Sequence, residues 1–138
     1  MPKPRASHAC ALDTVTHDRM YIHGGNGNGS SVDDLWVFDF RALVYRQIYQ
    51  SGSSPGKPPA GMYGHTLNNI GNNLYAFGGT NGFDYYREIL KFDLISRIWD
   101  KVIVASTGGA APQPMYKHTS VAHFSAGSHK LLIFGGLN

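Results

Sequence analysis

Short apolar runs alternate along the chain with stretches rich in glycine, asparagine, serine and proline. Three of these runs, RMYIHGG, NLYAFGG and KLLIFGG, share one pattern, and each closes on a pair of glycines. β-Branched and aromatic residues dominate the apolar runs, which is typical of β-strands bounded by turns. No segment combines the 3.6-residue apolar period of an amphipathic helix with capping residues. The pattern therefore predicts an all-β protein.

The three runs recur at a nearly constant interval. Their second glycines, Gly25, Gly79 and Gly136, lie 54 and 57 residues apart. Other features repeat at similar intervals: Phe38-Asp39 with Phe92-Asp93, Tyr45 with Trp99, and the histidines His8, His65 and His118, each after a proline-rich approach. Several features that hold one register indicate an internal repeat of a single supersecondary unit.

Each repeat reads as four short strands. The first begins at the histidine, the second is the run that ends in glycines, the third is LWVFDF or ILKFDL, and the fourth is VYRQIY or IWDKVIV. The second and third strands are almost continuously apolar, which indicates burial on both faces. Small antiparallel sheets stacked around an axis satisfy this requirement, and a period of about 50 residues with four strands per unit is that of a β-propeller.

On these motifs the chain resembles kelch repeats over essentially its whole length. The resemblance implies a partial kelch-type β-propeller of four-stranded antiparallel blades, with two full blades and half of a third. We expect the blades at residues 1–54 and 55–109, and the half blade at residues 110–138. Two departures stand out: Tyr45 occupies a position where kelch repeats usually carry tryptophan, and the third unit stops before its third and fourth strands.

An open arc of blades leaves apolar end faces and an unpaired strand edge exposed. Three interpretations remain open at this point. Further blades of a longer chain could complete the ring, a second copy could pair with the arc, or the arc could be stable alone.

The glycine pairs are expected to be structural, since glycine permits positive φ and close approach of backbone to backbone. The predicted structural residues are Gly24, Gly25, Gly78, Gly79, Gly135 and Gly136, together with the aromatic residues Tyr45 and Trp99. We expect both aromatic residues to pack between adjacent blades. The run GGNGNG leads from strand to strand with no helix N-terminus, so we do not interpret it as a nucleotide-binding loop.

The candidate reactive side chains also favour structural roles. Repeated histidines are separated by the rotation between blades, so we expect hydrogen bonds at the start of the innermost strand rather than a shared metal ion. Asp39 and Asp93 are expected to accept backbone N–H groups in turns. Cys10 is expected to be a small buried apolar residue. No catalytic, cofactor-binding or metal-binding residue is predicted.

Charge, hydropathy and cysteine content exclude some classes of protein. The net charge of +3 is scattered rather than clustered, which gives no stripe for nucleic acid, and no apolar run is long enough for a membrane-spanning helix. With one cysteine no internal disulfide can form, and the N-terminal residues lack the apolar core of a secretion signal. We therefore expect a cytoplasmic protein, with the nucleus as the alternative.

The loops vary most between repeats, and loops on a rigid scaffold are where binding surfaces form. The kelch resemblance implies that residues 26–32, 50–64, 80–87 and 105–117 emerge on one face. We predict a non-catalytic module that binds a peptide or loop of a partner protein there; the alternative is a metal-dependent enzyme or specifier on the same scaffold. The candidate partner-binding residues are Asn26, Asn28, Tyr63, Asn81, Phe83, Tyr85, Arg87, Tyr116 and Lys117.

Overall fold

A computed structural model describes residues 1–52, 56, 59–104 and 108–138. Within these residues the secondary structure is entirely β, which confirms the predicted class. The described part of the chain contains no helix that could cross a membrane.

Within the described residues, two four-stranded antiparallel sheets and a two-stranded sheet follow one another, and a short hairpin between the second and third strands of the first sheet forms a further two-stranded sheet. The first sheet has the order β1 (Ala9–Leu12), β2 (Arg19–His23), β5 (Leu35–Asp39) and β6 (Val44–Tyr49). The second has the equivalent order β7 (Thr66–Ile70), β8 (Asn73–Phe77), β9 (Ile89–Asp93) and β10 (Trp99–Val102). The third consists of β11 (Tyr116–Ser125) and β12 (Ser128–Leu137), which correspond to the first two strands of each earlier sheet.

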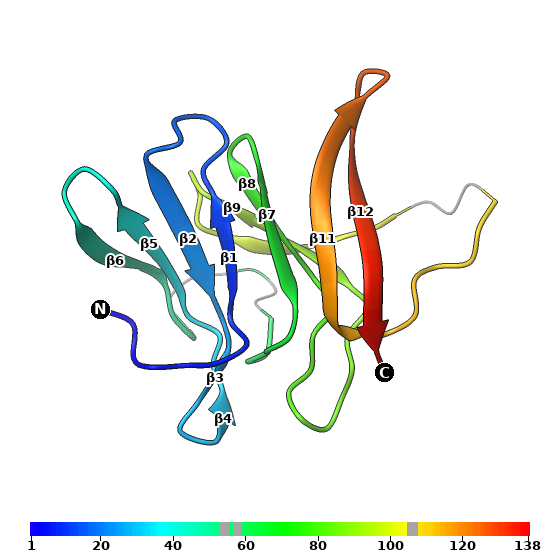
Figure 1. Cartoon of the computed structure of the whole chain (residues 1–138), viewed down its shortest axis with the longest axis horizontal. Helices are drawn as coiled ribbons and strands as arrows, with labels where there is room; N and C mark the ends of the chain where they lie inside the picture. The colour runs from blue at the N-terminus through cyan, green and yellow to red at the C-terminus, as the bar shows by residue number, and fades with distance from the viewer. Residues whose placement is uncertain (53–55, 57–58, 105–107) are drawn as a thin grey trace.

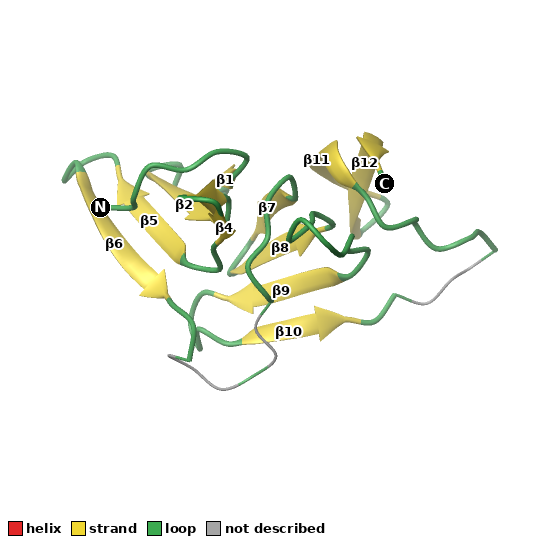
Figure 2. Ribbon diagram, turned by 90° about the horizontal axis from the view of Figure 1, so that it is seen from below, coloured by secondary structure: helices red, strands yellow, loops and turns green. Residues whose placement is uncertain are grey.

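The sheets are arranged like adjacent blades. Strand β7 lies beside β1 on one side and β11 on the other, so the first strands of the three sheets form the inner side of an arc (Figure 1). The view from below shows the outer strands β6 and β10 at the far ends of their sheets (Figure 2). This arrangement is an open arc of propeller-like blades, as the repeat pattern predicted.

One aspartate in each of the first two repeats stabilises the turn between the third and fourth strands. The Asp39 carboxylate accepts the N–H groups of Arg41 and Ala42 at 2.8 and 2.9 Å, and Asp93 accepts those of Ile95 and Ser96 at 2.8 and 3.1 Å. The predicted turn role of both aspartates is therefore confirmed. These hydrogen bonds hold the pKa of both carboxyl groups below its usual value.

The main hydrophobic core lies between the first and second sheets. The first sheet contributes Ala9, Ala11, Tyr21, Leu35 and Tyr49, and the second contributes Leu67, Leu74, Ala76, Phe92 and Trp99. Leu35, Leu74, Phe92 and Trp99 are completely shielded from solvent. Because each sheet buries one face against its neighbour, the core belongs to the interface between sheets rather than to either sheet alone.

The two repeat-equivalent aromatic residues behave differently, and the expectation for one of them was wrong. Trp99 packs between the sheets, with its ring centroid 5.0 Å from that of His23. Tyr45 instead is 37% exposed and packs on Phe38 of its own sheet, at 4.6 Å between ring centroids. The reason is position: Tyr45 lies on the face of the first sheet opposite the core, and no other sheet of the described chain covers that face.

Two smaller expectations also need correction. Cys10 is exposed rather than buried, because side chains alternate along β1 and only its neighbours Ala9 and Ala11 face the core. His8 is exposed too, whereas its repeat equivalents His65 and His118 are buried.

The sequence interpretation also missed a hairpin. Strands β3 (Asn26–Gly27) and β4 (Ser30–Ser31) pair across Asn28-Gly29, whose φ angles are +53° and +78°. An Asn-Gly pair with two positive φ angles is the preferred two-residue hairpin turn, so the signal was present in the loop. The predicted blade boundaries stay predictions, and the boundary between residues 54 and 55 lies outside the described residues.

Candidate functional site

The loops that connect second to third strands and one sheet to the next gather at one end of the molecule. In Figure 1 the β3–β4 hairpin and the loop at residues 80–87 extend below the sheets. The segments around residues 59–64 and 112–117 lie against them, because Met62 N–H donates to the Val32 carbonyl at 3.2 Å and Met115 N–H to the Tyr86 carbonyl at 3.1 Å. Residues 53–55, 57–58 and 105–107 of the predicted face lie outside the described residues.

Glycine pairs fix the base of these loops. Gly24 and Gly78 have φ angles of +66° and +70°, and a Cβ atom added at either would lie 2.6 Å from a carbonyl oxygen of the next unit, Met62 or Met115. The neighbouring glycines, Gly25 and Gly79, donate their N–H groups to those same carbonyls at 2.8 Å. The pairs therefore join successive sheets through main-chain contacts that leave no room for a side chain. In the third pair, Gly135 has open space around it, while Gly136 packs near His118 and Met115.

A buried histidine pair sits behind the first glycine pair. His23 at the end of β2 and His65 just before β7 lie 2.9 Å apart, Nδ1 to Nε2. Burial lowers the pKa of His23 to about 4, and burial likewise holds the pKa of His65 well below its usual value. Both rings are therefore neutral at pH 7 and share one hydrogen bond across the two sheets. His118 repeats the position of His65 and contacts Thr66 Oγ1 at 3.1 Å.

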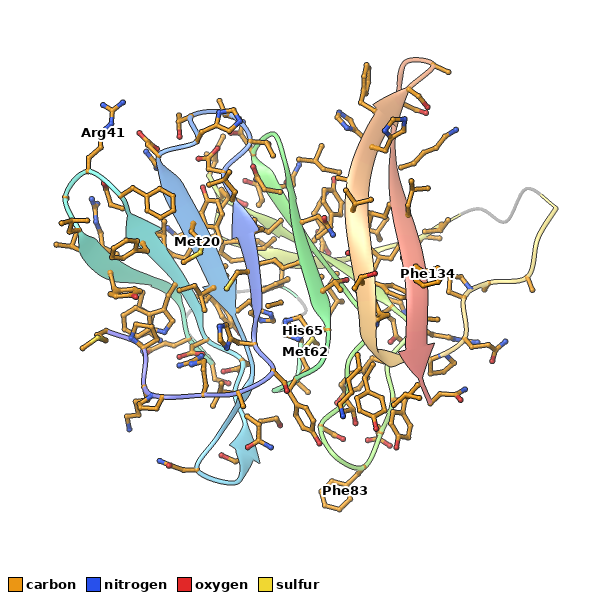
Figure 3. All side chains as sticks on the ribbon, viewed as in Figure 1. Met20, Arg41, Met62, His65, Phe83 and Phe134 are labelled. Carbon is orange, nitrogen blue, oxygen red and sulfur yellow. The ribbon has the colours of Figure 1, made fainter. Side chains whose placement is uncertain are left out.

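The loop at residues 80–87 is held in shape by its own polar groups. The Asn81 side-chain oxygen accepts the N–H groups of Phe83 and Asp84 at 2.9 and 2.7 Å. Thr80 closes the loop by donating its hydroxyl to the Asp84 carbonyl at 2.6 Å. Phe83 is left 91% exposed at the loop tip, where it points away from the molecule (Figure 3). Asn81 thus shapes the loop, and Phe83 is the side chain that the loop presents.

Tyr85 of this loop lies near two further tyrosines and a lysine. Thr80 forms β-bridges with both Tyr63 and Tyr85, and the Tyr85 ring lies 5.4 Å from the Tyr116 ring. Lys117 places its ammonium group 5.6 Å from the centre of the Tyr116 ring. We call Tyr63, Phe83, Tyr85, Tyr116 and Lys117 the tyrosine cluster. Tyr85 is 46% exposed, and Tyr63 and Tyr116 are half-buried. The tyrosine rings are therefore held by their neighbours, and part of their surface stays accessible to a partner.

The other predicted binding residues lie outside this cluster. Asn26 pairs through its backbone with Ala6, and Asn28 occupies the turn of the β3–β4 hairpin, which packs through Ser31 against Gly61. Arg87 lines a separate cavity beside β12. The structure therefore brings together five of the nine predicted residues, uses Asn81 to hold their loop in shape, and separates Asn26, Asn28 and Arg87.

The sequence interpretation overlooked one ionic site. Arg5 forms a two-pronged ion pair with Asp34, at 2.5 and 2.9 Å, and the Trp36 indole N–H donates to the same carboxylate at 2.8 Å. Burial alone would raise the pKa of Asp34, but these hydrogen bonds outweigh it and the pKa is lowered. The sequence signal was an acidic residue at the same repeat position, since Glu88 stands 54 residues after Asp34. In the structure Glu88 likewise pairs with a cation, Lys101. The pair ties the N-terminal segment to β5 and has a structural role.

No three His, Cys, Asp or Glu side chains of the described chain come close enough together to hold one metal ion.

A family model described as the KLHDC2/KLHL20/DRC7 Kelch-repeats domain matches residues 1–136. The chain is also similar to Kelch repeat-containing protein 2 of Saccharomyces cerevisiae, with 32% identity over 98% of this chain and 15% of that protein. Kelch domain-containing protein 10 of Homo sapiens is 29% identical over 99% of this chain and 29% of that protein. Acyl-CoA-binding domain-containing protein 6 of Oryza sativa subsp. japonica is 37% identical over 56% of this chain and 12% of that protein.

The chain therefore spans less than a third of the length of these relatives. The family match covers all three sheets, and the glycine pairs, strand order and turn aspartates repeat within it. The chain belongs to the Kelch-repeat family.

Proposed function

We propose that this chain is a non-catalytic interaction module that binds a peptide or loop of a partner protein through the tyrosine cluster. Kelch-repeat domains are in general protein-interaction modules, and this supports the class of function. The cluster supports the location, because tyrosine is enriched among the residues that dominate binding energy at protein interfaces. Nothing in the comparisons supports the metal-dependent enzyme considered from the sequence.

The observation that carries this proposal is the contact between the tilted rings of Tyr85 and Tyr116, on the loop that presents the exposed Phe83. Aromatic side chains offer large contact areas and lose little conformational entropy when they bind. Here the loop hydrogen bonds of Asn81 fix the backbone in advance, which lowers the cost of ordering the surface further. We place the module in the cytoplasm, with the nucleus as the alternative, as part of a larger kelch-containing protein.

The test compares partner capture by matched variants in the cell that makes the protein. Proximity labelling with quantitative mass spectrometry would use the wild-type chain, the double variant Phe83→Ala/Tyr85→Ala, and a control, Phe40→Ala. Phe40 is 40% exposed, packs beside Phe38 and is not part of the tyrosine cluster. We expect the double variant alone to lose a reproducible set of partners.

Both variants should unfold at nearly the wild-type temperature, because Phe83 is 91% exposed and Tyr85 and Phe40 are 46% and 40% exposed, outside the buried core. If the double variant keeps every partner, the tyrosine cluster is not the binding surface. If Phe40→Ala loses the same partners, the labelling reports general stickiness rather than a specific interface.

A further inference from the structure

The chain contains three Asn-Gly dipeptides, at Asn26-Gly27, Asn28-Gly29 and Asn81-Gly82. In such a dipeptide the backbone nitrogen of the glycine can attack the side-chain amide carbon of the asparagine, because glycine has no Cβ atom to obstruct the approach. The reaction needs an amide side chain and a glycine N–H that are not held by hydrogen bonds, and a backbone that can rotate. The structure gives the three dipeptides different surroundings, so the same chemistry is not equally available to them.

Asn26 is held by backbone pairing. Its N–H donates to the Ala6 carbonyl at 2.8 Å, and its own carbonyl accepts the Ala6 N–H at 2.9 Å. Within the β3–β4 hairpin it also pairs with Ser31. A Cβ atom added at Gly27 would lie 3.1 Å from the Pro4 carbonyl oxygen, so the residue that follows is closely packed too. Backbone rotation at this dipeptide is therefore restricted.

Asn81-Gly82 is held by hydrogen bonds to both reacting groups. The Asn81 side-chain oxygen accepts the N–H groups of Phe83 and Asp84, and its amide nitrogen lies 3.4 Å from the Asp84 carboxylate. The Gly82 N–H, which would be the attacking group, donates to the Thr80 hydroxyl at 2.9 Å. Attack at this dipeptide would break several of these hydrogen bonds, so the structure protects it.

Asn28 and Gly29 form the exposed turn of the β3–β4 hairpin, which extends below the sheets, away from the faces on which the sheets stack (Figure 1). Within the part of the chain that the structure describes, neither the Asn28 side chain nor the Gly29 N–H has a hydrogen-bond partner in the protein. A Cβ atom added at Gly29 would meet nothing within 4 Å, so the backbone there has room to rotate. The ladder behind the turn has only two residue pairs, and a ladder this short resists opening weakly.

We propose that Asn28 is a site of spontaneous deamidation, by which the folded protein acquires a negative charge at this turn over time. A base from the solvent removes the proton of the Gly29 nitrogen, which then bonds to the Asn28 Cγ atom. The bond from Cγ to Nδ2 breaks, and ammonia leaves with a proton from water. The resulting five-membered succinimide takes up one water molecule. It opens to aspartate, or to isoaspartate, in which the backbone runs through Cβ and Cγ.

Both products change the hairpin. Each adds one carboxylate, so the net charge falls by one from its value of +3. Isoaspartate also adds a methylene group to the backbone of a turn that is built for two residues. Because Asn26 in β3 pairs with Ala6, a distorted hairpin loosens the N-terminal segment. The hairpin is separate from the tyrosine cluster, so this modification is independent of the function proposed above.

The test follows all three dipeptides in the whole chain. The purified protein would be incubated at mildly alkaline pH and digested under acidic conditions that prevent further reaction. Liquid chromatography with tandem mass spectrometry resolves asparagine, aspartate and isoaspartate and separates Asn26 from Asn28. We expect Asn28 to convert at least tenfold faster than Asn26 or Asn81, and its rate to rise with pH, since the attacking nitrogen must lose its proton. In urea the three rates should become similar, because the folded surroundings are lost.

Two substitutions give matched controls. Gly29→Ala places a methyl group beside the attacking nitrogen and should slow conversion of Asn28 severalfold. Thr80→Val removes the hydroxyl that accepts the Gly82 N–H but keeps the shape of the side chain. It should speed conversion of Asn81 severalfold and leave the rate at Asn28 unchanged. Gly29 lies in open surroundings, so Gly29→Ala serves if Thr80→Val fails to fold by circular dichroism.

The isoaspartate form, separated by cation-exchange chromatography, tests the effect on the hairpin. Hydrogen exchange at the Ala6 N–H should be faster in this form than in the unmodified chain, because that group donates to the Asn26 carbonyl. Unchanged exchange at Ala6 would show that the hairpin does not hold the N-terminal segment.

Equal rates at Asn28 and Asn81 in the folded chain would overturn the proposal, since the hydrogen bonds at Asn81 would then give no protection. An Asn28 that stays intact in the folded chain but converts in urea would overturn it as well, because the hairpin would then protect its own turn. None of these results bears on the tyrosine cluster, whose test measures partner capture.

Discussion

The spaces on the two sides of the second sheet are built from the same repeat, but only one of them is filled. On the side of the first sheet, Trp99 and Phe92 are fully buried and the core is continuous. On the side of β12 there is a cavity of about 770 Å³. The two spaces differ by a third and fourth strand. The comparison teaches that in this fold the outer strands of one sheet complete the core of its neighbour.

The largest effect is expected when the central side chain of the filled space, Trp99, is removed. Trp99→Ala removes a fully buried indole, and we expect a loss of about 3–5 kcal/mol in the free energy of unfolding, measured by urea denaturation. Tyr45→Ala is the control, because Tyr45 holds the equivalent repeat position but is 37% exposed; it should cost less than about 1 kcal/mol. Similar losses for the two variants would mean that the contrast between these positions is wrong.

A smaller effect is expected where the sheets meet through glycine. Gly24→Ala would place a methyl group 2.6 Å from the Met62 carbonyl oxygen at a φ of +66°, and we expect a loss of about 2–4 kcal/mol. Gly135→Ala tests the same position of the third repeat, where φ is +81° but no atom lies within 4 Å, so only the backbone strain of about 1–2 kcal/mol applies. The unfolding midpoints of the two variants, in temperature or urea, measure the difference in stability between them. If the Gly135→Ala variant is as unstable as the Gly24→Ala variant, the predicted difference is wrong.

The smallest effect concerns pH. Burial lowers the pKa of His23 to about 4 from its usual 6.5, so between these values the unfolded chain binds more protons than the folded one. Stability should therefore be complete above about pH 6.5 and fall as the pH drops towards 4, by up to roughly 3 kcal/mol from His23. The midpoint of urea unfolding, measured at several pH values across this range, gives the dependence of stability on pH.

The repeat itself suggests the control for the pH experiment. Phe77 holds the position of His23 in the second sheet and packs edge-on against His118, as His23 packs against His65. His23→Phe should therefore fold and show a shallower pH slope; His65 and His118, whose pKa values burial also lowers, contribute to the slope that remains. The charged groups facing His23 are Asp34 and Arg5, which stay paired through this range. An unchanged slope would show that His23 does not carry the effect.

Much of the fold could be predicted because the determining signals are local. Glycine pairs, turn aspartates and apolar runs act on the φ and ψ angles of their own segments, and their spacing reveals the repeat. The same reasoning located the loops that hold Tyr63 and Tyr85 and the segment that leads to Tyr116, the first residue of β11. It did not separate Arg87 from them, because the direction of a side chain near a strand end depends on the neighbouring sheet.

The sequence by itself determined the class, the strand order within each repeat, and the positions where the chain turns, because backbone preferences and side-chain alternation operate over a few residues. Only the tertiary structure decided which copy of a repeated residue is buried. Tyr45 and Trp99 are equivalent in the repeat, yet one is exposed and the other lies in the core. Burial depends on whether a neighbouring sheet covers that face, and that is a property of the assembled arc rather than of the repeat.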